Sequence, residues 1–267
     1  MMMFASDLDR TLIYSKRALI ELNEQMDEKL IGVEKKDGRE VAFMTIHAYT
    51  LLKELANQLL FVPVTTRTHE QYSRIFIFTK QIPLTYAITS NGANIVHNGV
   101  SLKEWRHLVD YRLKHECMSF VEMIDAIASF QIKGVLKKVE NLFFYYILDE
   151  ELSIETKKLL QLMAEANGWR ISIQGRKLYL MPVPVCKGEA VKFIKEREGI
   201  HHIFGAGDSL LDDDFLKICD QSYIPSHGEL INSHINCNHY KQTQNKGVMA
   251  GEEIIEGIVK ELKGSLI

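Results

Sequence analysis

Short, mostly apolar runs alternate with segments of helical periodicity along the first quarter of the chain. Residues 3–8 and 60–64 form two such runs, and apolar side chains recur at helical spacing over residues 45–58 between them. Apolar runs of this length are typical of strands buried on both faces of a sheet. A helix between two of them predicts a right-handed crossover connection in a parallel sheet. We therefore expect an α/β fold.

Residues 30–44 interrupt this pattern. Apolar and polar positions alternate on both sides of Asp37-Gly38, a pair that is typical of tight hairpin turns. We therefore expect a β-hairpin beyond the first strand, either flanking the mouth of a site or decorating the surface without a role in binding.

The run at 60–64 ends in three threonines and Arg67, and residues 69–79 after them are expected to be helical. Hydroxyls and an arginine between a strand and a helix N-terminus favour an anion site. Thr68 as a plain N-cap is the alternative. Residues 86–89 are expected to form the next strand, which ends in Asn91-Gly92, a tight-turn signal in any context.

The order of helical and strand-like segments changes over residues 96–184. Two segments of helical periodicity are each followed by a pair of strand-like runs, which predicts an α+β unit with a mostly antiparallel sheet. The expected helices span residues 115–130 and 153–167, and the expected strands span residues 134–139, 142–148, 169–173 and 177–181. The α/β pattern then returns with a helix at 187–198 and a strand at 202–206. We therefore expect a core from residues 1–95 and 185–267 with an inserted domain at 96–184.

Composition narrows the class of protein. The net charge is -3 and 46% of the 267 residues are hydrophobic, which is ordinary for a globular protein and gives no electrostatic footprint for nucleic acid or anionic membrane. The four cysteines include no C-x-x-C pair, so a reducing compartment is expected. No leader or membrane-spanning run is seen in the sequence. These features predict a cytoplasmic protein.

Carboxylates follow two of the expected strands. Asp7 and Asp9 end the first run, and they would project to the same side if that strand continued. Such a pair suits a divalent cation, or a nucleophile beside a proton carrier, although aspartates are also common in turns after strands. Asp208 follows the strand at 202–206, so it would share a crevice with Asp7 if the two strands are neighbours. The macrodipole of the next helix accounts for some of the acidic residues at 212–214.

Several motifs occur together in a fixed order: D-x-D-x-T-L from Asp7, a strand ending in Thr65 with Arg67 two residues on, S-N-G-A at 90–93, K-G-x-A from Lys187, and G-D-S-x-x-D at 207–212. In combination they resemble the haloacid dehalogenase (HAD) superfamily of phosphohydrolases, in particular its Cof-like type IIB, sucrose-phosphate phosphatase-like branch. The resemblance spans nearly the whole chain. It implies a Rossmann-like parallel-sheet core with an inserted C2-type α+β cap domain.

The resemblance also implies roles for individual residues. Asp7 would attack phosphorus to give an aspartyl-phosphate, and Asp9 would protonate the leaving group and then activate water. Thr65 would bond the transferring phosphoryl group, and Lys187 would offset the negative charge on Asp7 and phosphate. The implied metal is Mg²⁺. The residues implied for it are Asp7, Asp9, Asp208 and Asp212, and those implied for the substrate are Thr66, Arg67 and Asn91.

Two positions depart from the family pattern. Thr66 stands where the family has glycine, so a Cβ could crowd this loop, and Leu211 stands where the family has asparagine, so one polar contact to phosphate or the metal shell is expected to be missing. The expected function is Mg²⁺-dependent hydrolysis of a small phosphorylated metabolite, such as a sugar phosphate. A phosphomutase on the same fold and a non-catalytic ligand-binding module are the alternatives.

Two other groups of residues could carry chemistry. His234, Cys237 and His239 could bind a transition metal or belong to a polar surface loop. The aromatic residues 143–146 could line a sugar site, although core packing accounts for one face of an alternating strand. The sequence does not indicate an oligomeric state.

Overall fold

The computed structural model describes residues 1–23, 27–82, 84–232 and 240–264. The chain divides into two compact units, the first from Met1–Ser101 and Lys187–Ile267, the second from Leu102–Cys186. The inserted unit therefore begins later than residue 96, because strands β7 (Asn94–His97) and β8 (Val100–Ser101) pair with the first unit. Within the described ranges, no helix is long and apolar enough to cross a membrane.

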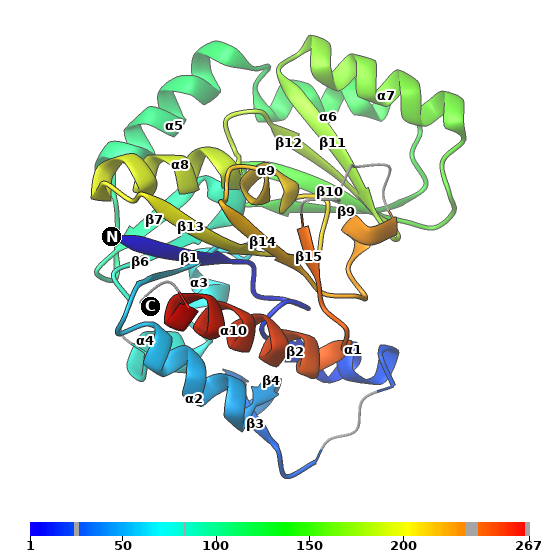
Figure 1. Cartoon of the computed structure of the whole chain (residues 1–267). Helices are drawn as coiled ribbons and strands as arrows, with labels where there is room; N and C mark the ends of the chain where they lie inside the picture. Colours follow the sequence, from blue (N-terminus) through cyan, green and yellow to red (C-terminus); the bar gives the residue numbers. More distant parts are fainter. Residues whose placement is uncertain (24–26, 83, 233–239, 265–267) are drawn as a thin grey trace. The chain divides into compact units, whose positions relative to one another are not determined.

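A five-stranded parallel sheet forms the centre of the first unit (Figure 1). Strand β1 (Met2–Ser6) lies between β5 (Leu60–Pro63) and β13 (His202–Ala206), and all neighbouring strands in this sheet run parallel. The register places Ser6 beside Ala206, so the residues that follow β1 and β13 emerge at the same edge. In sheet order the strands are β15 (Tyr240–Gln242), β14 (Gln221–Ile224), β13 (His202–Ala206), β1 (Met2–Ser6) and β5 (Leu60–Pro63).

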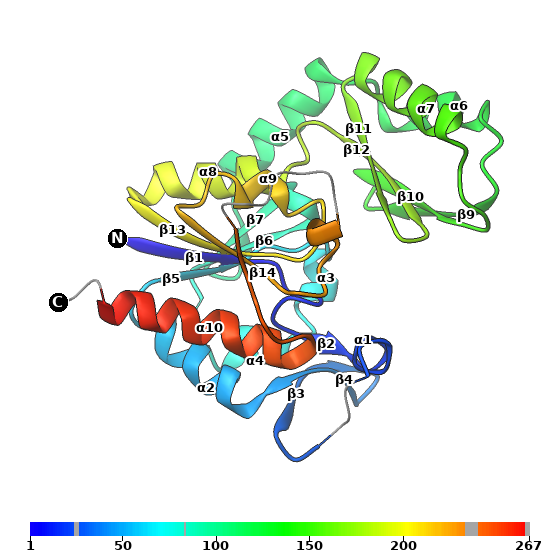
Figure 2. The ribbon, with the colours of Figure 1, turned by 45° about the vertical axis from the view of Figure 1, so that its right-hand side comes forward.

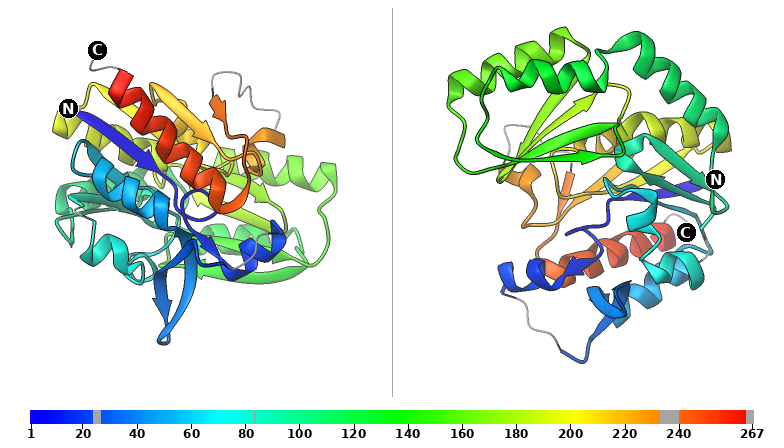
Figure 3. Two further views of the ribbon diagram at one scale, coloured as in Figure 1. Left: turned by 60° about the horizontal axis from the view of Figure 1, so that its bottom comes forward. Right: turned by 180° about the vertical axis from the view of Figure 1, so that it is seen from behind.

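Two smaller antiparallel sheets complete the strands of this unit. Strand β6 (Tyr86–Thr89) pairs with β7, and a parallel bridge between Val64 and Ile88 joins it to the end of β5. The expected hairpin is present as β3 (Leu30–Lys36) and β4 (Arg39–Thr45), and β2 (Tyr14–Ser15) pairs with β4. Figure 3, left, shows this hairpin in blue, extending away from the central sheet.

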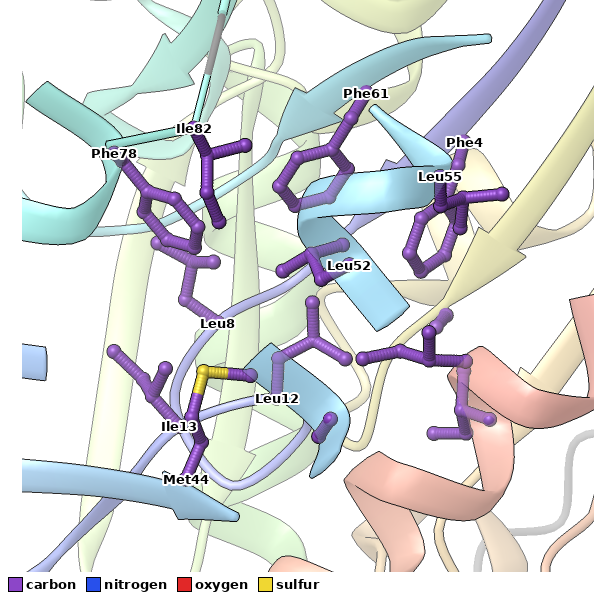
Figure 4. Packing of buried hydrophobic residues seen from close by; sticks show 14 of the residues in the cluster. Phe4, Leu8, Leu12, Ile13, Met44, Leu52, Leu55, Phe61, Phe78 and Ile82 are labelled. Carbon is purple, nitrogen blue, oxygen red and sulfur yellow. The ribbon is translucent and has the colours of Figure 1, made fainter. Parts of the chain in front are cut away.

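Helices cover both faces of the central sheet (Figures 1 and 2). Helices α2 (Ile46–Leu55) and α10 (Gly247–Gly264) pack on one face, and α8 (Lys187–Glu198) and α9 (Asp213–Leu216) lie on the other. On the α2 face, Phe61 stacks on Phe4 with ring centroids 5.3 Å apart and meets the edge of Phe78 (Figure 4). This core holds β1 and β5 in fixed register.

The segment expected as one helix at 69–79 is two short helices, α3 (His69–Tyr72) and α4 (Phe76–Lys80). Thr68 caps α3 in a capping box with Gln71. The helix then breaks at Ile75, whose ψ of 86° is not helical, and the carbonyl of Arg74 accepts a hydrogen bond from the amide of Lys35 on the hairpin. The remaining short helices of this unit are α1 (Lys16–Glu21), η1 (Ser90–Gly92) and η2 (Glu229–Asn232).

The second unit contains a four-stranded antiparallel sheet with two helices, α6 (Phe120–Ala128) and α7 (Ile154–Ala166), on one face (Figure 2). Leu160 of α7, Met123 of α6 and Trp169 of β11 belong to one buried cluster. The strands, in sheet order, are β11 (Trp169–Gln174), β12 (Lys177–Pro182), β10 (Phe143–Leu148) and β9 (Gly134–Val139). The helices are α5 (Lys103–Glu116), α6 (Phe120–Ala128) and α7 (Ile154–Ala166). The expected α+β composition is therefore confirmed.

The helix expected at 115–130 was wrong at its start. Cys117 is extended, and Ser119 opens α6 with a capping box to Glu122, so the chain ends one helix and begins another here. Helix α5 was not expected at all. Its charged residues obscure the apolar spacing, since only Trp105 and Val109 are buried.

Candidate active site

Asp7 and Lys187 form a buried ion pair at the carboxyl edge of the central sheet. Asp7 directly follows β1, and its amide donates to the carbonyl of Ala206 on the neighbouring strand at 2.8 Å. Lys187 is the first residue of α8 and only 1% exposed, and its Nζ donates to Asp7 Oδ1 at 2.7 Å. The second oxygen of Asp7 lies 3.5 Å from the hydroxyl of Thr11. Lys187 thus holds one oxygen of the Asp7 carboxylate and neutralises part of its charge.

Asp212 shares the same lysine. It is fully buried, and its Oδ1 accepts from Lys187 Nζ at 2.6 Å. Its Oδ2 accepts from the amides of Asp208 and Ser209 and from the Ser209 hydroxyl, at 3.1, 2.9 and 2.9 Å. These bonds close the turn between β13 and α9. Because the side chain of Asp212 is fixed on both oxygens, it holds Lys187 and the Asp208 backbone in place.

Asp208 completes a cluster of three carboxylates. It is 6% exposed, and one oxygen from each of Asp7, Asp208 and Asp212 lies within 4.8 Å of the other two. Arg10 brings a positive charge close to Asp208, with its Nε 3.9 Å from Asp208 Oδ2. The cluster therefore carries more negative than positive charge when its members are ionised, which suits a divalent cation with hard oxygen ligands.

The electrostatics agree with this geometry. Burial, followed by repulsion from Asp212, raises the pKa of Asp7 to about 7 although Lys187 opposes the shift. Burial, followed by repulsion from Asp7 and Asp212, raises the pKa of Asp208 well above its ordinary value. Burial alone would lower the pKa of Lys187, but Asp212 and Asp7 outweigh it and raise that pKa. Carboxylates that repel one another in this way are stabilised by a bound cation.

The strand does not continue from Asp7 through Asp9, which corrects the expectation of a continued strand. Strand β1 ends at Ser6 and the chain turns at Arg10, whose φ is 64°. The Asp9 side chain pairs with Arg67, which donates from Nε and from Nη2, both at 2.7 Å. Arg67 also contacts Glu34 through Nη1 at 2.9 Å. Burial would lower the pKa of Arg67, but Asp9 and Glu34 raise it.

The other residues expected at the substrate lie on the loops after β5 and β6. Thr65 is buried, and its Oγ accepts from the amide of Arg67 at 3.1 Å. Thr66 is half-buried beside it. Asn91 is buried with a φ of 56°, and its amide donates to the carbonyl of Thr65. The two loops are therefore joined by backbone hydrogen bonds. The Arg67 guanidinium is bound to the carboxylates of Asp9 and Glu34, and its contact with substrate stays a prediction.

Leu211 and Asp213 flank Asp212 in the sequence. Leu211 is 4% exposed and packs as an apolar residue. Asp213 is half-buried in the first turn of α9, where it accepts a hydrogen bond from Tyr240. The cluster of His234, Cys237 and His239 lies outside the described residues. Of the aromatic residues at 143–146, Phe144 and Tyr146 pack on the buried cluster of the second unit.

A second group of metal-ligand type occurs at the surface of the first unit, where His47, Glu252 and Glu256 come together. Glu252 accepts from Thr45 at the start of α2, and His47 contacts Glu256 at 3.2 Å. These contacts join α2 to α10 and account for the grouping.

Solved structures confirm the fold. The sucrose-phosphatase from Synechocystis sp. PCC6803, solved with sucrose and phosphate, is 19% identical with a TM-score of 0.69, and 97% of each chain is covered. A trehalose-6-phosphate phosphatase related protein is 18% identical with a TM-score of 0.55, and 99% of each chain is covered. A phosphatase of the haloalkanoate (HAD) superfamily from Bacteroides thetaiotaomicron is 14% identical with a TM-score of 0.57, covering 97% of this chain and 94% of that one.

The family match and the fold together identify a phosphatase of the HAD superfamily, as the motifs predicted. The family model described as sucrose-6F-phosphate phosphohydrolase matches residues 1–262. The chain therefore belongs to the sucrose-6F-phosphate phosphohydrolase family. No curated protein matches it significantly.

Proposed function

We propose that this protein is a Mg²⁺-dependent phosphatase that hydrolyses a small sugar phosphate through a phosphorylated Asp7. The observation that carries the proposal is the buried bridge from Asp7 through Lys187 to Asp212, with Asp208 in the same cluster. A lysine and a cation are what a carboxylate nucleophile needs, because a phosphate dianion does not otherwise approach it.

The three carboxylates fit Mg²⁺, which prefers oxygen ligands. In proteins it is usually coordinated by one or two carboxylates together with substrate phosphate and water. Asp7 and Asp208 would hold the ion, with Asp212 in support and the backbone carbonyl of Asp9 as a further ligand. When bound, Mg²⁺ would offset the negative charge that carboxylates and phosphate bring together.

Asp7 would attack phosphorus in line with the oxygen it does not share with Lys187. The bond from phosphorus to the leaving alkoxide breaks, and Asp9 donates the proton that makes this leaving group an alcohol. Asp9 then takes a proton from water, which attacks the aspartyl-phosphate and releases inorganic phosphate. Because the Thr65 hydroxyl oxygen accepts the Arg67 amide, its own O–H can donate to the transferring phosphoryl group.

The substrate class follows from the family. Sucrose 6F-phosphate is the first candidate, because the matching family model is named for it, and the structural relatives named for sucrose and trehalose phosphates support a sugar phosphate in general.

The test is release of inorganic phosphate by the purified protein from sucrose 6F-phosphate, trehalose 6-phosphate and p-nitrophenyl phosphate, with Mg²⁺ or with EDTA. We expect release that requires Mg²⁺ and falls to background in Asp7→Asn. Asp213→Asn is the matched control: it changes an aspartate of the same segment that bonds Tyr240 instead of Lys187, so activity should remain.

Other outcomes would identify another function. A phosphomutase would convert a sugar monophosphate into its isomer when the bisphosphate is added, without stoichiometric phosphate release. Saturable binding of sugar phosphates with no turnover of any substrate would indicate a ligand-binding module and refute the proposal.

A further inference from the structure

Glu34, on strand β3 of the hairpin, is a buried glutamate that the motifs do not include. It is 6% exposed, and Val33 before it is fully buried. In a regular strand these two neighbours would point to opposite faces. Glutamate is rarely buried unless it is paired, so its partner identifies what the residue does.

An irregularity in the hairpin explains how both residues are buried. Gly32 lies opposite Phe43, but Glu34 lies opposite Ala42, so two steps on β3 match one step on β4. This is a β-bulge, which turns a side chain away from its regular direction and is frequent beside active sites. Lys35 after it donates its amide to Arg74, which anchors the bulged strand to the segment between α3 and α4.

The partner of Glu34 is Arg67. Glu34 Oε2 lies 2.9 Å from Nη1 of Arg67, whose side chain is 15% exposed. The other edge of the same guanidinium, Nε and Nη2, donates to both oxygens of Asp9 at 2.7 Å. A guanidinium is planar and rigid, so fixing Nη1 sets the direction in which the opposite edge points.

We propose that Glu34 is a positioning residue for the acid/base Asp9, acting through Arg67. This inference rests on the proposed function, in which Asp9 carries protons. Glu34 directs the guanidinium and balances its charge, and the guanidinium holds the carboxylate of Asp9, which follows the nucleophile by two residues. The hairpin is thereby part of the site and not a surface decoration.

If Glu34 positions Asp9, the effect of losing Glu34 should depend on the leaving group of the substrate. A sugar phosphate has a poor alkoxide leaving group, which needs the proton from Asp9 in the transition state, whereas p-nitrophenolate leaves with little need of a proton. Loss of Glu34 should therefore impair the first substrate much more than the second. A change that only destabilised the fold would reduce both equally.

The experiment compares kcat/KM of Glu34→Gln for the best sugar phosphate and for p-nitrophenyl phosphate, since kcat/KM reports the steps up to phosphoryl transfer. We expect a decrease of about tenfold or more for the sugar phosphate and of less than about twofold for the aryl phosphate, a fraction of the ~10²–10⁴ that general acid catalysis supplies. Glu40→Gln, an exposed glutamate on β4, is the control and should leave both values unchanged.

Arg67→Lys provides a second variant in case Glu34→Gln folds poorly. It keeps the positive charge but loses the planar fork, so it should show the same dependence on leaving group. Equal losses for the two substrates, or no loss in a folded Glu34→Gln, would overturn the assignment of Glu34. Absence of phosphate release from both substrates by the unmodified protein would instead overturn the proposed function, so the two failures are distinguishable.

Discussion

Replacing Asp208 by asparagine should stabilise the metal-free protein and weaken its response to Mg²⁺. Asp208 is buried beside Asp7 and Asp212, and its oxygen lies within 4.8 Å of theirs. Two like charges about 4 Å apart repel by about 4 kcal/mol at an effective dielectric constant of about 20. Protonation of a carboxylate relieves much of this, so we expect Asp208→Asn to gain roughly 1–2 kcal/mol without metal.

Mg²⁺ should reverse the order of stability. At about 100 times its Kd, a ligand of the native state stabilises it by ~2.7 kcal/mol. Because ~1 kcal/mol moves the Tm of a domain of this size by about 2–4 °C, the unmodified protein should gain roughly 5–10 °C. Asp208→Asn should gain less than about a third of that, because the ion loses a charged ligand.

The assay is thermal unfolding in EDTA and across a series of MgCl₂ concentrations, with ionic strength held constant by NaCl. Asp213→Asn serves as the control for loss of one negative charge outside the cluster. A lower Tm for Asp208→Asn in EDTA, together with a Mg²⁺ response equal to that of the unmodified protein, would refute the assignment of Asp208 to a cation site.

Three further predictions concern the fold. Burial lowers the pKa of His227, whose Nε2 contacts the Arg10 carbonyl and whose Nδ1 accepts the Gly247 amide, so its stabilising contribution should be present above pH 6.5 and decline as the pH falls below that value. In His227→Gln, the free energy of unfolding measured in urea should therefore depend less on pH between pH 7.5 and 5.5, by at most about 1.4 kcal/mol per pH unit. Phe61→Ala should cost about 3–5 kcal/mol in the same assay, and exposed Ile20→Ala less than about 0.5. Gly168→Ala should unfold at a lower temperature than Gly175→Ala, because both have positive φ but only the first Cβ would meet backbone, 2.2 Å from the Glu116 carbonyl; equal Tm values would contradict this.

The parallel core was predictable because its signals are local. Apolar runs mark β1, β5 and β13, and the helix between β1 and β5 predicts that these two strands run parallel. Asp7 and Asp208 were expected in one crevice on the condition that β1 and β13 are neighbours, and the structure confirms that they are. The directions of the side chains after the strands were not predictable. Whether the Asp9 side chain points in the same direction as that of Asp7 depends on the turn at Arg10. The two-residue spacing of the aspartates does not predict that turn.

The features that were missed depend on contacts between distant segments. Helix α5 buries only Trp105 and Val109 along fourteen residues, so its periodicity is weak. Glu34 looks like one polar position in an alternating strand, and only the bulge and the guanidinium of Arg67, far along the chain, give it a role. A buried charge of this kind is identified by its partner and not by the sequence around it.

The position of Lys187 connects these observations to the order of the chain. The second unit ends at Cys186, and the next residue is the lysine that bridges Asp7 and Asp212. An insertion is tolerated here because β8 and α8 both belong to the first unit, so contacts within that unit can hold Lys187 in place. Gly188, the next residue, packs so closely on the carbonyl of Asp214 that a Cβ on it would lie 2.3 Å from that oxygen. This close approach of α8 to α9 places the lysine between carboxylates from opposite ends of the chain. The three carboxylates of the cluster and Lys187 therefore all lie in the first unit, and Glu34, Arg67 and Asp9 lie in the same unit.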